Sequence, residues 1–394
     1  MQIKQNKIPT LTKQMLLPFL MVSALFALWG FANAVTDPMV QAFKKVMELS
    51  NSQAAWVQMA FYGGYFCMAL PAAIFVRKYT YKHGIIVGLA LYGIGALLFY
   101  PAAMTEQFWF FCLGLYVLTF GLAFLETTAN PYIIAMGDPT TGTRRLNFAQ
   151  AFNPVGSLLG LLVAQQFVLK KLQSDDIDAF ETLDKIQKIA IRSADLLVIR
   201  DPYIVLGGVV FVYLVIIGLL KMPVSKNEES LPPLGVTLVN LLRKKFYRIG
   251  VLAQAFNVGA QIMCWTYIYQ YAEAKGISAD EAANYQFIAF IFFLIGRAVG
   301  TYLLKDFRAN IMLRTFTIFA ILSCLGTIFF AGSAGLYSLV ITSFFMSIMF
   351  PTIYGETLKD LNSDDTMIGA AGLVMAIVGG ALMPKLQGDI IDIG

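Results

Sequence analysis

Eleven long apolar runs occur in this 394-residue sequence, and they restrict its fold more than any other feature. They lie at 16–39, 55–76, 84–103, 108–136, 147–169, 202–221, 248–271, 283–304, 311–331, 335–357 and 367–384. A hydrocarbon core about 30 Å thick needs roughly 20 helical residues to cross it, so each run is long enough for a transmembrane helix. A β-barrel is excluded because barrel strands alternate apolar and polar residues over about ten positions.

The composition agrees with a chain that lies mostly in lipid. Hydrophobic residues make up 58% of the sequence and charged residues only 13%, and the charged residues cluster between the apolar runs. A soluble chain of this length needs more charged surface to stay dissolved. The sequence therefore predicts an all-α polytopic membrane protein.

The distribution of Lys and Arg between the apolar runs predicts the orientation of the chain. Basic residues gather before the first run and in the segments 77–82, 144–145, 221–248 and 305–314. The segment 170–201, on the opposite side, carries acidic residues that offset its basic ones. Because cytoplasmic loops are enriched in Lys and Arg, we expect a cytoplasmic N-terminus. The net charge of +5 follows from this topology, and we expect no nucleic-acid partner.

The polar segment 222–247 divides the apolar runs into six before it and five after it. Short motifs recur on either side at nearly the same distance: AAWVQ at 54–58 and AANYQ at 282–286, NPYI at 130–133 and FPTI at 350–353. Such a pattern predicts a duplicated six-helix unit. We therefore expect an N-terminal half at 1–221, a cytoplasmic linker at 222–247 and a C-terminal half at 248–394, from which the twelfth helix is missing.

The second part of this linker has its own helical pattern. Leu234, Leu238 and Leu241 recur at helical spacing beside basic residues. An apolar stripe next to basic residues is typical of a helix that lies in the membrane interface. We therefore expect an amphipathic helix on the inner membrane surface.

Glu126 stands near the middle of the fourth apolar run, within the motif FLETTANP (124–131) and far from any basic residue. A charged side chain at the membrane centre costs at least ~2.5–3.5 kcal/mol on insertion scales. Burial disfavours the charged form, so this acid is a candidate to gain and lose a proton. The alternative is a structural acid that is hydrogen-bonded to a Thr or Asn of a neighbouring helix.

A second acid, Asp37, lies toward the outer end of the first run and is followed by Pro38. Asn33 lies four residues before Asp37 and Trp29 another turn before that, so the three residues share one helical face. A face of this kind suits a water-filled pocket better than lipid. The alternative is that Asp37 is an acid at the membrane interface.

Amide and indole side chains gather in two other runs. Gln150 and Asn153 lie three residues apart in the fifth run, and Asn257, Gln261 and Trp265 repeat a four-residue spacing in the seventh. Amides both donate and accept hydrogen bonds, and an indole offers a flat apolar face. Together they suit a neutral polyhydroxylated ligand. The alternative for each amide is a hydrogen bond between two helices.

Arg297, in the motif IGRAVGTY, is the only basic residue well inside an apolar run. Its side chain either extends to the cytoplasmic interface or pairs with an acid or substrate inside the membrane. The single histidine, His83, and the four cysteines form no metal-ligand or nucleophile–base spacing. We therefore expect no metal, no cofactor and no enzymatic activity.

Several motifs give the chain a family resemblance: FYGGYF (61–66), LETTANP (125–131), RLNFAQAFNPVG (145–156), GAQIMCWTYI (259–268) and IGRAVGT (295–301). With them the chain resembles the fucose–galactose–glucose proton-symporter branch of the major facilitator superfamily, most closely its L-fucose–proton symporters. The resemblance implies a major facilitator fold, in which Asp37 and Glu126 couple transport to protons. It also implies that Trp29, Gln150, Asn153 and Arg297 lie in or beside the sugar pathway.

The same resemblance implies a transporter of a bacterial inner membrane that imports L-fucose or a related hexose with protons. Its expected partners are a small neutral sugar, protons and membrane lipid, and we expect a monomer. Ala34 and Phe350 depart from the fucose pattern, because a second asparagine can occupy the first position and a tyrosine is expected at the second. A glucose/galactose transporter, with sodium as an alternative coupling ion, therefore stays open, as does a sugar sensor without flux.

Overall fold

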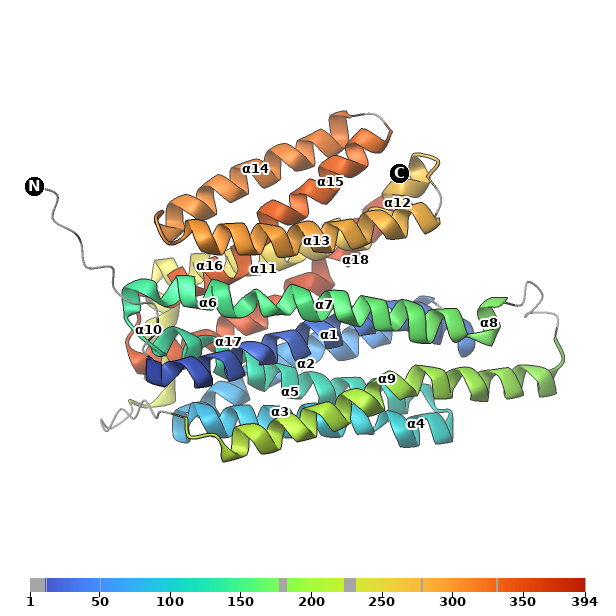
Figure 1. Ribbon diagram of the computed structural model, residues 1–394, viewed down its shortest axis with the longest axis horizontal. Helices are drawn as coiled ribbons and strands as arrows, with labels where there is room; N and C mark the ends of the chain where they lie inside the picture. Colours follow the sequence, from blue (N-terminus) through green and yellow to red (C-terminus); the bar gives the residue numbers. More distant parts are fainter. Residues whose placement is uncertain are drawn as a thin grey trace, which may run out of the picture.

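The structure is a computed structural model that describes residues 11, 13–49, 51–176, 183–222, 232–277, 279–330 and 332–393. The described residues form helices joined by short turns, with no strand among them. The helices run roughly side by side along the long axis of the molecule (Figure 1). This arrangement is the one a membrane requires, because a helix satisfies its backbone hydrogen bonds internally.

The first group of helices is α1 (Leu16–Val46), α2 (Asn51–Lys78), α3 (Tyr81–Leu97), α4 (Phe99–Thr105), α5 (Phe108–Ala135), α6 (Gly142–Gln150), α7 (Phe152–Val163), α8 (Gln173–Asp176) and α9 (Lys185–Leu219). The second group is α10 (Leu234–Arg243), α11 (Lys245–Thr266), α12 (Ile268–Ala274), α13 (Ala279–Leu303), α14 (Ala309–Phe329), α15 (Ser333–Met346), α16 (Met349–Leu358), α17 (Ser363–Met375) and α18 (Gly379–Ile393). Short helical turns complete them: η1 (Lys13–Met15), η2 (Pro139–Thr141), η3 (Ala164–Val168), η4 (Leu169–Lys171) and η6 (Ala376–Val378).

Ten helical segments of the described chain are long and apolar enough to cross a membrane, and they match ten of the eleven predicted runs. The remaining run, 248–271, forms α11 and most of α12. On length and composition alone it is not among the ten. The reason is that α11 carries the amides of Gln254, Asn257 and Gln261, which lower its hydropathy. This helix faces other helices through its polar residues rather than facing lipid all round.

Helices distant in sequence pack against each other in the middle of the molecule. Within the first group, α1 packs on α7, α2 on α5, and α3 on both α5 and α9. Within the second group, α14 and α13 pack on α15, and α11 packs on α18. The two groups meet where α17 packs on α2, α16 on α6 and α13 on α7. In Figure 1, α3 and α9 lie on one side of the molecule and α14 on the other, with α1, α2 and α5 between them.

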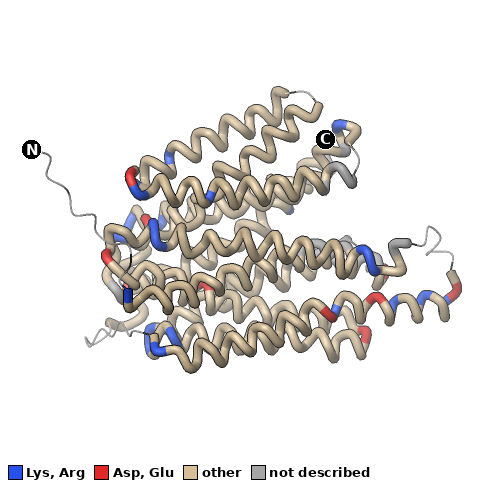
Figure 2. Tube along the Cα trace, viewed as in Figure 1, with Lys and Arg blue, Asp and Glu red and all other residues tan. Residues whose placement is uncertain are grey.

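Charged residues concentrate at the two ends of the helices. Figure 2 shows Lys and Arg mostly at the end that holds the start of α3 and of α6, and at the start of α14. Charged residues at the opposite end belong largely to η4 and to the beginning of α9. Between the two ends the helices carry few charges, as a hydrocarbon environment demands.

The segment 170–201 is more helical than the sequence predicts. Its last part forms the first turns of α9, and the carboxylate of Asp184 caps this helix by accepting a hydrogen bond from the backbone N–H of Gln187 at 2.8 Å. A capped start allows polar residues to extend a transmembrane helix beyond the membrane. The α9 helix therefore begins at Lys185, well before the predicted apolar run at 202–221. Residues 177–182 of this segment lie outside the described residues.

The predicted interfacial helix of the linker corresponds to α10. Leu241 and Thr237 are its buried residues, and α10 packs on α11 and α17. Residues 223–231 of the predicted linker lie outside the described residues.

Candidate functional site

A central cavity of about 100 Å³ lies where the two groups of helices meet. That volume is large enough for several water molecules. Its walls come from α1, α2, α6 and α7 on one side and from α11, α13, α16 and η6 on the other. The polar lining side chains are Asn33, Tyr62, Tyr65, Gln150, Asn153, Ser157, Gln261 and Arg297, and the large apolar ones include Trp29, Trp265, Phe290, Phe293 and Phe350.

Seven of the eight residues that the sequence predicts for substrate binding line this one cavity: Trp29, Asn33, Gln150, Asn153, Gln261, Trp265 and Arg297. They come from five helices: α1, α6, α7, α11 and α13. A cavity that combines amides with aromatic faces offers hydrogen bonds to hydroxyl groups and an apolar surface to the C–H face of a sugar ring.

The two tryptophans are held in place by hydrogen bonds to other helices. Trp29 Nε1 donates to the hydroxyl of Tyr65 on α2, and Trp265 Nε1 donates to Ser343 Oγ on α15 at 3.1 Å. Trp265 also packs against Phe290, with ring centroids 4.7 Å apart. Satisfying the indole N–H fixes each ring and leaves its face available to the cavity.

Arg297 lies inside the membrane rather than extending to its surface. Its side chain is buried, its Nε donates to the carbonyl oxygen of Ser347 at 2.6 Å, and its guanidinium lies 4.8 Å from the ring centre of Phe293. Its Nη1 donates to the backbone carbonyl of Gln150 at 2.9 Å and to the side-chain oxygen of Gln150 at 3.4 Å. Arg297 on α13 therefore joins the two groups of helices at the cavity.

A chain of hydrogen bonds leads from the cavity to Glu126. Gln150 Nε2 donates to Asn130 Oδ1 at 2.8 Å, and Asn130 Nδ2 donates to the Glu126 carboxylate. Together with the contact between Arg297 and Gln150, these bonds connect the acid on α5 with the guanidinium on α13. Chains of buried hydrogen bonds strengthen one another because each bond polarises the next. The Glu126 carboxylate is therefore connected with the wall of the cavity.

Glu126 itself lies behind the cavity wall and is only 2% exposed. Among the described residues, no hydrogen-bond donor reaches its Oε1 atom. It interacts electrostatically with Arg297 and with the hydroxyls of Tyr65 and Tyr354. The Glu126 carboxylate thus bonds to Asn130 of its own helix through one oxygen, and its role as a proton carrier stays a prediction.

Of the predicted substrate-binding residues, Asn257 stands apart from the cavity lining. Asn257 is buried in α11, and in the described part of the chain neither atom of its amide has a hydrogen-bond partner. Asp37 belongs to α1, but its side chain lies outside the described residues.

Sequence reasoning missed several cavity residues. Tyr62 and Tyr65 belong to the motif FYGGYF, which could have pointed to them, whereas Phe290 and Phe293 are two of many aromatic residues in a chain that is 14% aromatic. Asn130 was also missed as the link between Glu126 and Gln150. Its spacing of four residues from Glu126 places both on one helical face, and that signal could have found it.

An ion pair and a hydrogen bond join the two groups at the end of the molecule that is predicted to be cytoplasmic. Arg77, at the end of α2, binds Asp364 of α17 through Nε–Oδ1 at 2.5 Å and Nη2–Oδ2 at 2.9 Å. Within the second group, Lys244 binds Asp365 at 2.7 Å. Thr143 of α6 donates to Glu356 of α16 at 3.0 Å. Bidentate Arg–carboxylate pairs are strong and directional, so this end of the interface is held together.

Glycines bring α1 and α7 into direct backbone contact beside the cavity. A Cβ atom added to Gly156 of α7 would lie 1.8 Å from the carbonyl oxygen of Ala27, and one added to Gly30 of α1 would lie 2.1 Å from that of Asn153. No other residue fits at such distances. Small residues at a helix interface allow this close packing in membranes.

The chain resembles known transporters over nearly its whole length. It is 57% identical over 390 residues to the L-fucose-proton symporter of Haemophilus influenzae, covering 98% of this chain and 91% of that protein. It is 35% identical to the L-fucose-proton symporter of Escherichia coli, covering 97% and 88%. It is 29% identical to a glucose/galactose transporter of Brucella abortus, covering 94% and 87%.

A solved structure confirms the fold class. The crystal structure of a transporter of the same superfamily, FucP, in the outward conformation superposes with a TM-score of 0.88 at 35% identity and covers 97% of this chain and 94% of that one. A model of the Major Facilitator Superfamily matches residues 17–384. The same fold class is indicated by the ten apolar spans of the described chain, by the superposition and by the relatives. The chain is a multi-pass membrane protein that belongs to the major facilitator superfamily.

Proposed function

We propose that this chain is a secondary active transporter that imports L-fucose together with protons. The observation that carries the proposal is the hydrogen-bonded chain from Glu126 through Asn130 and Gln150 to Arg297, which joins a buried acid to an amide-lined cavity. The two relatives that are named L-fucose-proton symporters are 57% and 35% identical, more than the 29% of the named glucose/galactose transporter.

In this proposal the sugar occupies the central cavity. The amides of Asn33, Gln150, Asn153 and Gln261 bind its hydroxyl groups, and the indoles of Trp29 and Trp265 contact its apolar face. Asn257 of α11 is a further amide that we assign to sugar binding. A neutral sugar suits a site whose one cation, Arg297, is already engaged by backbone carbonyls.

Proton coupling follows from the chemistry of Glu126. When Glu126 is ionised, it accepts the hydrogen bond of Asn130 and attracts Arg297 across the interface. Protonation removes that attraction and weakens the chain of hydrogen bonds that holds the two groups of helices together. The protein then changes between its two orientations with the sugar bound. Release of the proton on the other side restores the bonds and resets the cavity.

We assign Asp37 a different role from Glu126. Asp37 lies two helical turns beyond Trp29, toward the side from which sugar and protons enter in this proposal. Water at that depth keeps a carboxylate more easily ionised than Glu126. Asp37 then receives the incoming proton first, while Glu126 responds to sugar in the cavity.

The ion pair of Arg77 with Asp364 and the hydrogen bond of Thr143 to Glu356 support an outward-facing state, because both join the two groups of helices at the predicted cytoplasmic end. The similarity to the structure of FucP in the outward conformation agrees with this assignment. We further propose an N-terminal six-helix half at 1–221 and a C-terminal half with five spans at 248–394, joined by the linker 222–247. The N-terminus lies in the cytoplasm, and the transporter acts as a monomer in a bacterial inner membrane.

A glucose or galactose transporter is the second candidate. Ala34 and Phe350, which depart from the fucose pattern, both line the cavity. An apolar residue at each position removes hydrogen-bond partners that a specific sugar would use. The identity of the sugar therefore depends on these two positions more than on the shared amides.

Uptake into proteoliposomes tests the proposal directly. Purified protein is reconstituted, and uptake of labelled L-fucose, D-galactose and D-glucose is measured with and without an imposed pH gradient or sodium gradient. We expect accumulation of L-fucose only when the outside is acidic. Accumulation of glucose or galactose under a sodium gradient, or sugar binding without any uptake, would contradict the proposal.

A further inference from the structure

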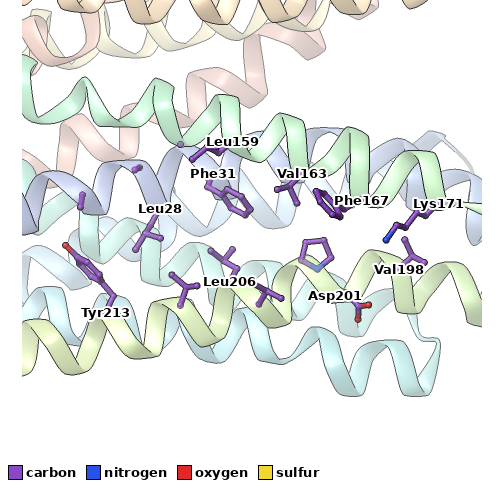
Figure 3. A pocket seen from close by; sticks show the side chains of 16 residues that line it. Leu28, Phe31, Leu159, Val163, Phe167, Lys171, Val198, Asp201, Leu206 and Tyr213 are labelled. Atoms are coloured by element: carbon purple, nitrogen blue, oxygen red, sulfur yellow. The ribbon is translucent and has the colours of Figure 1, made fainter.

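A second and larger cavity lies on the outer surface of the helices rather than at their centre. It is a groove of about 680 Å³ between α1, α7, η3 and α9 (Figure 3). Its floor and walls are almost entirely apolar, with Leu28, Phe31, Leu159, Val163 and Leu206 among its labelled residues in Figure 3. The sugar cavity uses none of these residues.

The groove opens sideways, between helices that cross the membrane. Its rim residues Leu159, Phe167 and Val205 are 54%, 58% and 68% exposed. A laterally open apolar groove at this depth attracts neither water nor a polar ligand. Membrane lipid is therefore the expected occupant of the groove. The shape and the charges of the groove indicate which lipid fits it.

The length of the groove matches one leaflet of a bilayer. Along α9 the lining extends from Val198 to Tyr213, and the part from Asp201 to Tyr213 is about 18 Å long at the helical rise of 1.5 Å per residue. Half of a hydrocarbon core about 30 Å thick is about 15 Å. A single acyl chain of the leaflet nearest Asp201 therefore spans the groove.

Two opposite charges stand at the end where a lipid headgroup would lie. Lys171 of η4 and Asp201 of α9 both line the groove and are labelled at one end of it in Figure 3. Lys171 Nζ lies 5.5 Å from the ring centre of Phe167, and the Asp201 carboxylate accepts hydrogen bonds from its neighbour Arg200. The rest of the lining carries no charge.

We propose that this groove is a binding site for one phosphatidylethanolamine molecule, whose acyl chain fills the groove and whose headgroup meets Lys171 and Asp201. The phosphate accepts a charge-assisted hydrogen bond from Lys171, and the ammonium group donates one to Asp201. A phosphatidylglycerol headgroup lacks the cation for Asp201. Phosphatidylcholine carries a cation without an N–H donor, so it forms only the first of the two bonds.

The proposed lipid touches the same pair of helices that forms the sugar cavity. On α1, Leu28 and Phe31 face the groove while Trp29 and Asn33 face the cavity. On α7, Leu159 faces the groove while Asn153 faces the cavity. A bound lipid therefore supports the back of the cavity wall. This effect on transport rests on the proposed function, whereas lipid binding does not.

Native mass spectrometry of the purified full chain tests the site by titration with palmitoyl-oleoyl forms of phosphatidylethanolamine, phosphatidylcholine and phosphatidylglycerol. We expect phosphatidylethanolamine to bind most tightly. Val205→Trp fills the groove and should remove this binding. Its control, Val215→Trp, places the same residue on the same helix outside the groove lining, where valine is 58% exposed, and should leave binding unchanged.

A charge variant tests the headgroup independently of the groove. Lys171→Ala should weaken phosphatidylethanolamine binding about tenfold, the scale of one hydrogen bond to a charged group. Its neighbour Lys170, which donates to Gln166 at 2.8 Å and does not line the groove, is the matched control as Lys170→Ala. Unchanged lipid binding in folded Val205→Trp would refute the site, and equal binding of all three lipids would refute the headgroup assignment. Neither measurement requires sugar, so a failure of the proposed lipid site is distinguishable from a failure of the proposed transport function.

Discussion

The central cavity and the lateral groove lie on opposite sides of the same two helices, yet they differ in almost every property. The cavity is small, about 100 Å³, and is lined by amides, a guanidinium and aromatic rings. The groove is large, about 680 Å³, and almost wholly apolar. The comparison teaches that size does not mark the chemical site of a membrane protein. Polar groups inside a membrane are costly, so their convergence marks it.

The largest expected effect follows from changing the acid that is connected to the cavity. Glu126→Gln keeps the size of the side chain and mimics its protonated form. Accumulation of sugar driven by a pH gradient should be abolished, while exchange of labelled for unlabelled sugar persists. Both are measured in proteoliposomes that contain the same amount of protein. Normal accumulation by this variant would remove Glu126 from the coupling mechanism.

A large effect on sugar binding is expected from Gln150, the residue that contacts both Asn130 and Arg297. Gln150→Ala removes at least one hydrogen bond in a network that includes a charge, worth roughly 1.5–3 kcal/mol. At 1.4 kcal/mol per factor of ten, sugar affinity should fall about 10- to 100-fold. Tryptophan fluorescence measures the affinity, because Trp29 and Trp265 line the cavity.

The matched control for this variant is Gln166→Ala. Gln166 bonds Lys170 at the far end of the η3–η4 segment and lines neither the cavity nor the groove. It should bind sugar as the unaltered protein does. Equal losses of affinity in both variants would show that the effect is not specific to the cavity.

An intermediate effect is expected at Asp37, which lies on α1, the helix that both regions share. Asp37→Asn should impair uptake driven by a pH gradient but change sugar affinity little, because this acid is assigned to proton entry. Fluorescence binding and gradient-driven uptake are measured side by side on the same preparation. If affinity collapses together with uptake, Asp37 binds the sugar or supports the structure, and its separation from the role of Glu126 fails.

The smallest effect is expected on the groove side of α7. Leu159→Ala removes an apolar side chain that is 54% exposed. Substitutions of exposed residues usually change stability by no more than about 0.5 kcal/mol, so sugar affinity should stay within about twofold. The same fluorescence titration measures it. A loss of affinity as large as that of Gln150→Ala would erase the contrast between the two faces.

Much of the fold and part of the site can be predicted from the sequence, because these features depend on contrasts between residues that are neighbours in the chain. All eleven runs are readable because hydrophobic runs contrast with charged segments, and Glu126 stands out because its run is otherwise apolar. Ten of the runs also meet the length and hydropathy expected of a membrane-spanning helix in the described chain, while the amides of α11 lower the hydropathy of the eleventh. The direction of Arg297 was not readable, since a cation near a helix end can reach either water or a partner.

The groove could not be predicted at all. Leu159 or Val205 has the same side chain whether it faces free lipid, a groove or a neighbouring helix, so composition carries no signal. Phe290 and Phe293 of the cavity were missed for the same reason. Only the three-dimensional packing of helices separates these cases. The link through Asn130 likewise required the placement of Gln150 on a different helix.

The backbone contact between α1 and α7 at Gly30 and Gly156 has a consequence for how affinity changes during a transport cycle. Because backbone atoms of the two helices meet directly at these glycines, no room is left for one helix to shift against the other, and the two move together. Trp29, Asn33 and Asn153 therefore keep their mutual spacing in every orientation of the proposed transporter. In this proposal the affinity for sugar therefore changes through Gln261, Trp265 and Arg297, which move toward or away from the residues on α1 and α7.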